Sequence, residues 1–352
     1  MGSLVDNHHC KAKVGINGFG RIGRIALRQS LTRDDLQVVA INHMCATTDD
    51  LIYLIRHDTT HGLLKDEIDI KQLSEDAISL NGRVIALLST RDIAQLNWHK
   101  LGVAYVLECT GKFTKVDQAV RHITEAQCNR VVISAPSADA PTFVYGVNSE
   151  GYHNSAVNRV VSAASCTTNC VTPILKALND SMGVSQAFLT TVHAATQSQQ
   201  ILDGYSKKNR RLGRSVFNNI IPTTTGASKA IAAVIPELHG KVKGISIRVP
   251  TSDVSMVDLT VATSRPSSLS EVLDIFVRAS NGTMAGVLSV SDQELVSSDL
   301  LGSPFSTIVD SNACLELNPQ FYKIIAWYDN EWGYSSRLLD LVSMIHCKGQ
   351  QD

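Results

Sequence analysis

Two cysteines lie four positions apart in SAASCTTNC, residues 162–170, among small and hydroxyl-bearing side chains. Cys166 and Cys170 could pack in a core, form half of a metal site, or supply a nucleophile. A metal site is disfavoured, because this C-x₃-C pair has no second group of cysteines or histidines at ligand spacing, and we expect no bound metal. A nucleophile would need activation, since free cysteine is only a few per cent thiolate at neutral pH.

The flanking sequence supplies one source of activation. The β-branched run at residues 159–163 precedes Cys166, and the helix-forming segment TTNCVTPILKALND follows it. Cys166 is therefore expected at the positive end of a helix, which lowers the pKa of a thiol, with Cys170 buried one turn further in. His193 ends the apolar run of TTVHAATQSQQ and is a candidate base. The alternative is a hydrogen-bonded core histidine.

A glycine-rich turn near the N-terminus indicates a second kind of chemistry. Gly18, Gly20 and Gly23 in INGFGRIGR have the G-x-G-x-x-G spacing, after a strand-like run and before a helix-like one. In that context the first glycine permits a tight turn, the second lets a pyrophosphate approach, and the third lets helix and strand pack closely. The pattern predicts a dinucleotide site; an ordinary glycine turn is the alternative.

Short apolar runs that alternate with helical segments occupy the chain up to about residue 165. They predict a Rossmann-type α/β domain with a parallel sheet covered on both faces. The longer runs after Cys166 predict an α+β domain with a mostly antiparallel sheet. We assign residues 1–165, with a short N-terminal tail, to dinucleotide binding, residues 166–332 to catalysis, and residues 333–352 to a helix that returns to the first domain.

Composition excludes several function classes. The 352 residues are 44% hydrophobic and 18% charged, with a formal net charge of -1, which is unlike a chain built around a nucleic-acid surface. No apolar run approaches the roughly 20 residues that cross a bilayer, and the N-terminus lacks the core of a signal peptide. Eight cysteines without such a signal predict free thiols and a cytoplasmic location.

Six motifs carry a family resemblance: INGFGRIGR, SCTTNC, TVHA, IIPTTTGASKA, IRVPT and WYDNEWGYS. In this order and spacing they resemble the phosphorylating glyceraldehyde-3-phosphate dehydrogenases, from about Lys13 to Ile345. The resemblance implies NAD as cofactor, a phosphorylated aldehyde and inorganic phosphate as substrates, and an acyl phosphate product. It also implies a homotetramer in which YSKKNRRLGR reaches a neighbouring cofactor site.

The resemblance also assigns roles by motif. Cys166 would attack the aldehyde, and His193 would stabilise the thiolate and take the hydroxyl proton as hydride leaves. Positions that match the site of the substrate's own phosphate are Thr196, Ser198 and Arg248, and those that match the site of attacking phosphate are Ser165, Thr167, Thr225, Gly226 and Arg214. Positions that match the dinucleotide site, besides the three glycines, are Arg21, Ile22, Thr110, Gly111, Ser134, Asn330 and Tyr334.

Two departures bear on specificity. His43 stands where an acidic residue normally binds the adenosine ribose and repels a 2′-phosphate, so NADP could be accepted, with Arg91 among the donors. Alternatively, Asn42 and Thr47 hold the ribose of NAD. Gly204 and Tyr205 differ from the family pairs at that position, and the sequence after His193 somewhat resembles erythrose-4-phosphate dehydrogenases. Two alternatives to the triose-phosphate enzyme therefore remain. One is an erythrose-4-phosphate dehydrogenase, and the other is a diverged paralogue retained for binding or resistance.

Overall fold

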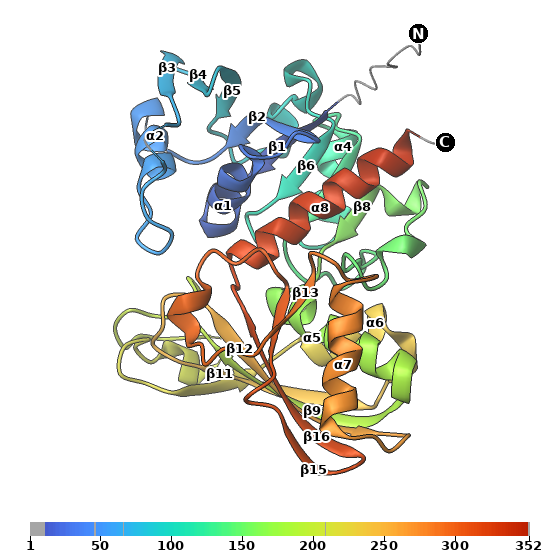
Figure 1. Cartoon of the computed structure of the whole chain (residues 1–352). Helices are drawn as coiled ribbons and strands as arrows, with labels where there is room; N and C mark the ends of the chain where they lie inside the picture. The colour runs from blue at the N-terminus through green and yellow to red at the C-terminus, as the bar shows by residue number, and fades with distance from the viewer. Residues whose placement is uncertain (1–10, 46, 66, 208, 351–352) are drawn as a thin grey trace.

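The computed structural model describes residues 11–45, 47–65, 67–207 and 209–350. Two sheets, one above the other in Figure 1, organise the chain. The first has the strand order β3-β4-β5-β2-β1-β6-β7-β8 and the second β10-β11-β9-β12-β16-β14-β13, with β15 paired to β16. The two-domain α/β architecture expected from the sequence is confirmed.

The first sheet is parallel except at one edge. Its strands are β1 Ala12–Asn17, β2 Leu36–Asn42, β3 Ile70–Ser74, β4 Ala77–Leu80, β5 Arg83–Leu88, β6 Tyr105–Glu108, β7 Arg130–Ile133 and β8 Val160–Ser162. The strands β3, β4 and β5 pair antiparallel, whereas β2 pairs parallel with both β5 and β1. The sheet is therefore mostly parallel, as predicted, with an antiparallel edge where short turns such as Asn81-Gly82 allow hairpins.

Helices cover the first sheet and connect it to the second. They are α1 Arg21–Ser30, α2 Thr48–Arg56, α3 Val116–Ala119, α4 Arg121–Thr124 and the terminal α8 Trp332–Gly349. The α8 helix buries Leu338, Leu339, Val342 and Ile345 in the same core as β1 and β2. It runs beside α1 and so brings the end of the chain back to its beginning (Figure 1).

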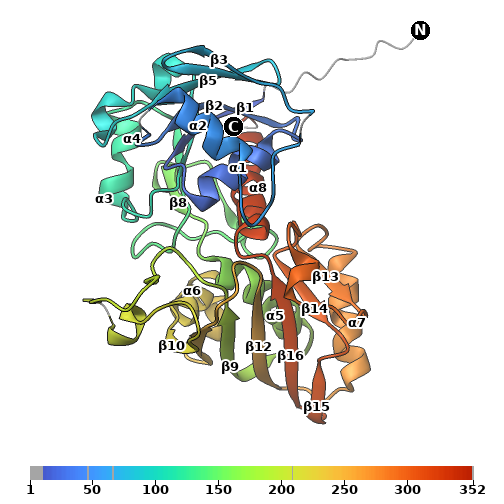
Figure 2. The ribbon, with the colours of Figure 1, turned by 90° about the vertical axis from the view of Figure 1, so that its left-hand side faces the viewer.

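The second sheet is mostly antiparallel and is covered by helices on one face. Its strands are β9 Val184–His193, β10 Ile221–Thr224, β11 Val242–Arg248, β12 Ser255–Thr263, β13 Leu288–Ser291, β14 Thr307–Asp310, β15 Leu315–Asn318 and β16 Phe321–Tyr328. The helices α5 Cys166–Met182, α6 Ala227–Val234 and α7 Leu269–Ser280 lie to one side of it (Figures 1 and 2). Alternate residues of β12 are fully buried, as expected for a sheet with one covered face.

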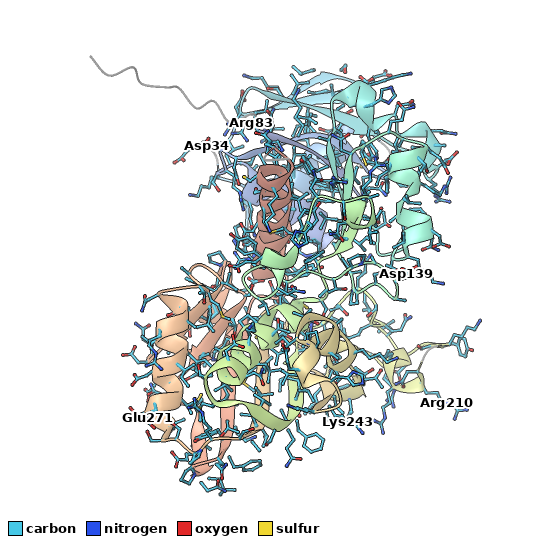
Figure 3. The ribbon with its side chains drawn as sticks, turned by 90° about the vertical axis from the view of Figure 1, so that its right-hand side faces the viewer. Asp34, Arg83, Asp139, Arg210, Lys243 and Glu271 are labelled. Atoms are coloured by element: carbon cyan, nitrogen blue, oxygen red, sulfur yellow. The ribbon has the colours of Figure 1, made fainter. Side chains whose placement is uncertain are left out.

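The loop between β9 and β10 carries Arg210, and this part of it projects from the body of the second domain (Figure 3). In the described part of the chain, no helix combines the length and the apolar composition needed to cross a membrane. The seven cysteines in that part are all free thiols.

Candidate active site

A cavity of about 820 Å³ opens between the two sheets, at the carboxyl ends of the first sheet's strands. It brings together side chains and backbone from both halves of the chain. The predicted site residues that line it are Gly20, Arg21, Ile22, Ser134, Ser165, Cys166, Thr167, His193, Thr196, Thr225, Gly226, Arg248, Asn330 and Tyr334.

Cys166 is the first residue of α5, as predicted, and the backbone before it is held in an uncommon conformation. Ala164 has φ of 58°, in the left-handed region that side-chain-bearing residues rarely adopt. The Tyr334 hydroxyl donates a hydrogen bond of 3.0 Å to the Ala164 carbonyl, and Ser165 caps the helix by accepting from Thr168 N. Strain retained at this point is typical of a functional turn.

Cys166 and His193 meet across the cavity, with Sγ 3.5 Å from Nε2. Burial raises the pKa of the Cys166 thiol to about 11, although the Arg248 charge opposes this. Burial and the Arg248 charge lower the pKa of His193 to about 4. The predicted proximity of the two groups is confirmed. The N-terminus of α5 acts against burial at the thiol, because the positive end of a helix favours the thiolate.

Arg248 lies beside His193 because β11 and β9 are adjacent and place the two residues in register. Its Nη1 is 2.5 Å from His193 Nδ1 and 3.2 Å from the Ala194 carbonyl. Its Nε is buried without a hydrogen-bond partner in the described part of the chain. An unpaired guanidinium N–H on a cavity wall is suited to an anionic ligand.

Two of the predicted phosphate residues do not reach the cavity. Arg214 is 62% exposed and pairs with Asp203 at 2.9 Å. Ser198 is exposed and hydrogen-bonded to Thr196, which does line the cavity. Neither position contributes in this conformation, because the β9–β10 loop turns its side chains outward and no sequence pattern predicted that path.

The glycine turn has the three roles that its spacing predicts. Gly18, at φ of +96°, would place a Cβ 2.7 Å from Thr110 N, and a Cβ on Gly23 would lie 2.2 Å from the Gly18 carbonyl. A Cβ on Gly20 would meet nothing within 4 Å, so the backbone there faces open space. The α1 helix also begins without a side-chain cap or an acidic residue. This cradle fits a pyrophosphate.

Buried polar side chains support that turn from below. Asn17 accepts a hydrogen bond of 2.7 Å from Asn42, and its own amide donates to Glu108 at 2.5 Å. Glu108 also accepts from Thr110 N at 2.8 Å. The amide of Asn42 and the backbone N–H of Thr110 are thus engaged within the protein. Gly111 continues the turn at φ of 68°.

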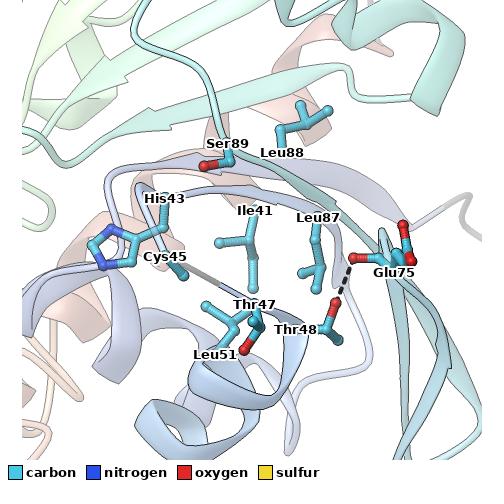
Figure 4. Close-up of a pocket in the computed structure, with 10 residues that line it drawn as sticks. All are labelled: Ile41, His43, Cys45, Thr47, Thr48, Leu51, Glu75, Leu87, Leu88 and Ser89. Atoms are coloured by element: carbon cyan, nitrogen blue, oxygen red, sulfur yellow. Dashed lines mark hydrogen bonds between the residues drawn. The ribbon is translucent and has the colours of Figure 1, made fainter.

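His43 lines a separate pocket of about 100 Å³ beyond β2. Figure 4 shows its ring at one end of this pocket and Glu75 at the other. Burial and the charge of Arg24 lower the pKa of His43, so the ring is neutral at pH 7. Its Nδ1 accepts from Phe19 N at 3.4 Å, which leaves the proton on Nε2. Arg91 lies outside both pockets.

Asn330, which lines the main cavity, is oriented by its neighbours. Ala194 N donates to Ser255 Oγ at 3.0 Å, and Ser255 donates to Asn330 Oδ1 at 2.6 Å. The Asn330 amide nitrogen therefore remains the donor for a ligand. Asn330 lies just before α8 and Tyr334 in its first turn, so the start of the C-terminal helix contributes to the cavity between the domains.

The sequence did not reveal a buried charged cluster at the domain junction. His61 Nε2 lies 3.2 Å from Glu331 Oε2 and 3.2 Å from Asp253 Oδ2, and Arg21 bridges Glu331 and Asp58. The N–H at His61 Nε2 donates its hydrogen bond to Glu331 Oε2. Asp253 Oδ2 therefore faces the ring without accepting a hydrogen bond. Burial disfavours charge on His61, but its contacts with Asp253 and Glu331 raise its pKa to about 9.

Potential metal ligands also meet there, since atoms of His61, Asp253 and Asp329 lie within 4.8 Å of one another. Asp329, however, already accepts hydrogen bonds from the backbone N–H groups of Gly302, Glu331 and Trp332. We interpret the cluster as an imidazolium bridging carboxylates across the two domains. Only the fold could reveal it, because His61 lies 270 residues before Glu331 in the sequence.

The chain matches two family models. Residues 12–116 match the NAD binding domain of glyceraldehyde 3-phosphate dehydrogenase, and residues 165–330 match its C-terminal domain. The chain belongs to the glyceraldehyde-3-phosphate dehydrogenase family.

Relatives in this family are similar over almost the whole chain. The glyceraldehyde-3-phosphate dehydrogenase 1 of Trichormus variabilis is 47% identical over 339 residues, 95% of this chain and 97% of the relative. A Caenorhabditis elegans protein of the same name is 45% identical over 343 residues, 96% of this chain and 99% of the relative. The Neurospora crassa glyceraldehyde-3-phosphate dehydrogenase is 45% identical over 333 residues, 95% and 97% of the two chains.

The charge on His61 predicts a pH dependence of stability. Its folded-state pKa of about 9 exceeds the usual 6.5, so its contribution is complete below pH 6.5 and is lost as pH rises through 9. Urea denaturation should show the free energy of unfolding falling by on the order of 2 kcal/mol over that interval. His61→Gln should be less stable at pH 6.5 and should vary less with pH. If the free energy of unfolding varied equally with pH in the wild type and in His61→Gln, His61 would not be a bridging imidazolium.

Proposed function

We propose that this chain oxidises glyceraldehyde 3-phosphate to 1,3-bisphosphoglycerate, with NAD accepting the hydride and inorganic phosphate cleaving the acyl group from the enzyme. The observation that carries the proposal is the meeting of Cys166 at the start of α5 with His193 at the end of β9, in a cavity that continues to the glycine turn. The nucleophile, its base and the glycine turn for the dinucleotide therefore line the same cavity. The relatives named above support a triose rather than a tetrose substrate.

In this proposal, different residues that line the cavity carry out different steps of the reaction. Cys166 Sγ forms the bond to the aldehyde carbon, and the N–H groups at the start of α5 stabilise the oxyanion. His193 Nε2 takes the hydroxyl proton when hydride leaves, which turns the thiohemiacetal into a thioester. Arg248 and Thr196 bind the phosphate of the substrate, while Thr167, Thr225 and the uncapped N-terminus of α6 at Gly226 bind the attacking phosphate.

The division of the chain follows from these tasks. We propose residues 1–165 as the cofactor domain, 166–332 as the catalytic domain and 333–352 as the returning helix. The free thiols support a reducing, cytoplasmic location. A diverged binding or resistance paralogue is the second candidate, suggested by His43, and the intact cysteine, histidine and arginine oppose it.

Replacing the nucleophile tests the reaction directly. Cys166→Ser should reduce NAD reduction, measured with triose phosphate and inorganic phosphate, by on the order of 10³-fold or more, because an alcohol is far less acidic than a thiol. Cys170→Ser is the matched control. Cys170 lies one helical turn after Cys166, is fully buried and contacts Thr307, so this variant should stay active. Turnover in Cys166→Ser comparable to that of the wild type would contradict the covalent mechanism.

The ribose end of the cofactor site supports relaxed selectivity. His43 offers a neutral N–H donor where an acidic residue would repel a 2′-phosphate. Ser89 adds a hydroxyl group to the same pocket, whereas the Thr47 hydroxyl already caps α2. No arginine lines this pocket, so nothing there attracts NADP strongly. We therefore expect NAD to be used and NADP to be tolerated.

His43→Asp should lower kcat/KM for NADP by roughly tenfold or more, through repulsion of the 2′-phosphate, while kcat/KM for NAD changes less. His43→Asn provides a control of the same size without the charge. If NADP is already rejected by the wild type as firmly as by His43→Asp, selectivity arises elsewhere, and Gly204-Tyr205 becomes the first place to look.

The uncovered face of the second sheet supports a homotetramer. Phe188 on β9 and Ile245 on β11 point to this face and are 69% and 50% exposed. Leu202 and Tyr205 in the β9–β10 loop are also largely exposed. Exposed apolar side chains on neighbouring strands, such as Phe188 and Ile245, mark surfaces that associate.

Light scattering should therefore give the mass of four 38.2 kDa chains for the wild type. Phe188→Asp should yield dimers or monomers, because it would bury a charge in the interface. Val277→Asp is a matched control on α7, where the side chain is 41% exposed on the helical side of the sheet. A monomeric wild type would contradict the proposal, and a tetrameric Phe188→Asp would exclude this face.

A further inference from the structure

Two chains of hydrogen bonds end on the carboxylate of Glu108, the buried last residue of β6. The first chain starts at the backbone N–H of Thr90, which donates to Asn42 Oδ1 at 3.1 Å. Asn42 then donates to Asn17 Oδ1 at 2.7 Å, and Asn17 donates to Glu108 Oε2 at 2.5 Å. Because a backbone N–H can only donate, the direction of every bond in this chain is fixed.

The second chain starts at an indole. Trp98 Nε1 donates to His122 Nδ1 at 3.0 Å, and both side chains are fully buried. An indole N–H can only donate, so Nδ1 carries no proton and the single ring proton lies on Nε2. His122 Nε2 therefore donates to Glu108 Oε2 at 3.1 Å. The histidine beside Glu108 is thus an uncharged donor.

Glu108 is consequently an ionised acceptor. Its other oxygen, Oε1, accepts from the hydroxyl of Thr110 and, at 2.8 Å, from the backbone N–H of the same residue. Four donors fill the four lone-pair positions of the carboxylate and leave none for a proton. In the described part of the chain its one ion-pair contact is with His122, which is neutral. Glu108 is therefore a buried negative charge that no cation offsets among the described residues.

This charge lies directly behind the cavity wall. A Cβ on Gly18 would lie 2.7 Å from Thr110 N, so the glycine turn rests on the backbone that Glu108 holds. Cys109, the next residue, lines the cavity. Ser134 also lines it and donates to the Glu108 carbonyl at 2.9 Å. The carboxylate thus faces the cofactor site from below, between the glycine turn and the nucleophile's side of the cavity.

The cofactor of this family changes its charge when it accepts hydride. The nicotinamide ring of NAD is cationic and that of NADH is neutral, whereas the pyrophosphate is anionic in both. The ring would lie near Cys166, so that hydride can pass to it from a carbon bonded to the sulfur; this placement rests on the proposed function. A buried carboxylate repels the pyrophosphate of both forms, but it attracts the ring of the oxidised form alone.

We propose that Glu108 is a specificity-determining residue that makes the site bind NAD in preference to NADH through its buried charge. His122 is the positioning residue. It holds the carboxylate ionised by donating one hydrogen bond, and it does not cancel the negative charge, as a lysine or arginine at that position would. The product NADH is therefore bound less tightly than the substrate NAD and leaves more readily.

Dissociation constants measured by calorimetry on the full chain test this proposal with NAD, NADH and ADP-ribose. Glu108→Gln removes the charge at almost constant shape, so the ratio of Kd for NADH to Kd for NAD should fall by roughly fivefold or more. ADP-ribose keeps the pyrophosphate but has no cationic ring, so the ratio of its Kd to that of NADH should not change. An unaltered preference for NAD in Glu108→Gln would overturn the proposal.

Two further variants separate charge from shape. Glu108→Asp keeps the charge on a shorter side chain, so it should weaken NAD and NADH alike and retain the preference. Glu125→Gln is the matched control, because it removes the same charge from the exposed end of α4, where water screens it. The preference should be unchanged in this control. If Glu108→Asp lost the preference as fully as Glu108→Gln, the shape of the turn would decide it and the charge would not.

Trp98→Phe tests the same charge with Glu108 in place. Without the indole N–H, His122 Nδ1 can bind a proton, so the ring becomes cationic as the pH falls and offsets the carboxylate. The groups that face this ring are Glu108, Asn17, Trp98 and, at a centroid distance of 6.3 Å, Phe113. Of these only Glu108 ionises. Between about pH 8 and about pH 6 the preference for NAD should fall more steeply in Trp98→Phe than in the wild type. Equal pH dependence in the two proteins would count against the proposal.

The binding data also distinguish this inference from the proposed function. If the wild type binds neither NAD nor NADH, the proposed dehydrogenase reaction itself is wrong. If both bind and Cys166→Ser abolishes turnover, but Glu108→Gln leaves the preference for NAD intact, the reaction stands and the electrostatic role of Glu108 alone fails.

Discussion

The start of α5 is the constraint on which the rest of the structure depends. Ala164 adopts a left-handed conformation there, and the Tyr334 hydroxyl from α8 holds its carbonyl at 3.0 Å. Asn169 ties the same turn to the carbonyl of Ala163 at 2.8 Å. This anchoring joins the last strand of the first sheet to the first helix of the second domain, and it directs Cys166 into the space between them.

Electrostatics at the domain junction complement that anchoring. His61 from the first domain faces Asp253 and Glu331, and Arg21 at the first turn of α1 binds Glu331 as well. The cofactor cradle and the catalytic sheet are therefore linked by buried charges beside the cavity. A buried network of this kind is costly to break by removing one partner, so it favours one arrangement of the two domains.

Several site residues predicted from sequence acquire a different meaning in three dimensions. The Ser165 hydroxyl caps α5, and Arg214 forms an ion pair with Asp203 on the surface. Asn42 supports the glycine turn from below. In each case the residue type suits a ligand, but a neighbour in the fold already uses its polar atoms. A residue type by itself does not reveal which neighbour occupies its polar atoms.

The element types, the glycine cradle and the position of Cys166 at a helix start could be predicted, because local spacing and short-range hydrogen bonds control these features. The contacts of Arg248 with His193 and of His61 with Asp253 depend on how distant parts of the chain pack. The register of β9 with β11 sets the first pair, and the packing of two domains sets the second. Burial also acts on both groups, because it raises the pKa of the Cys166 thiol and lowers the pKa of His193.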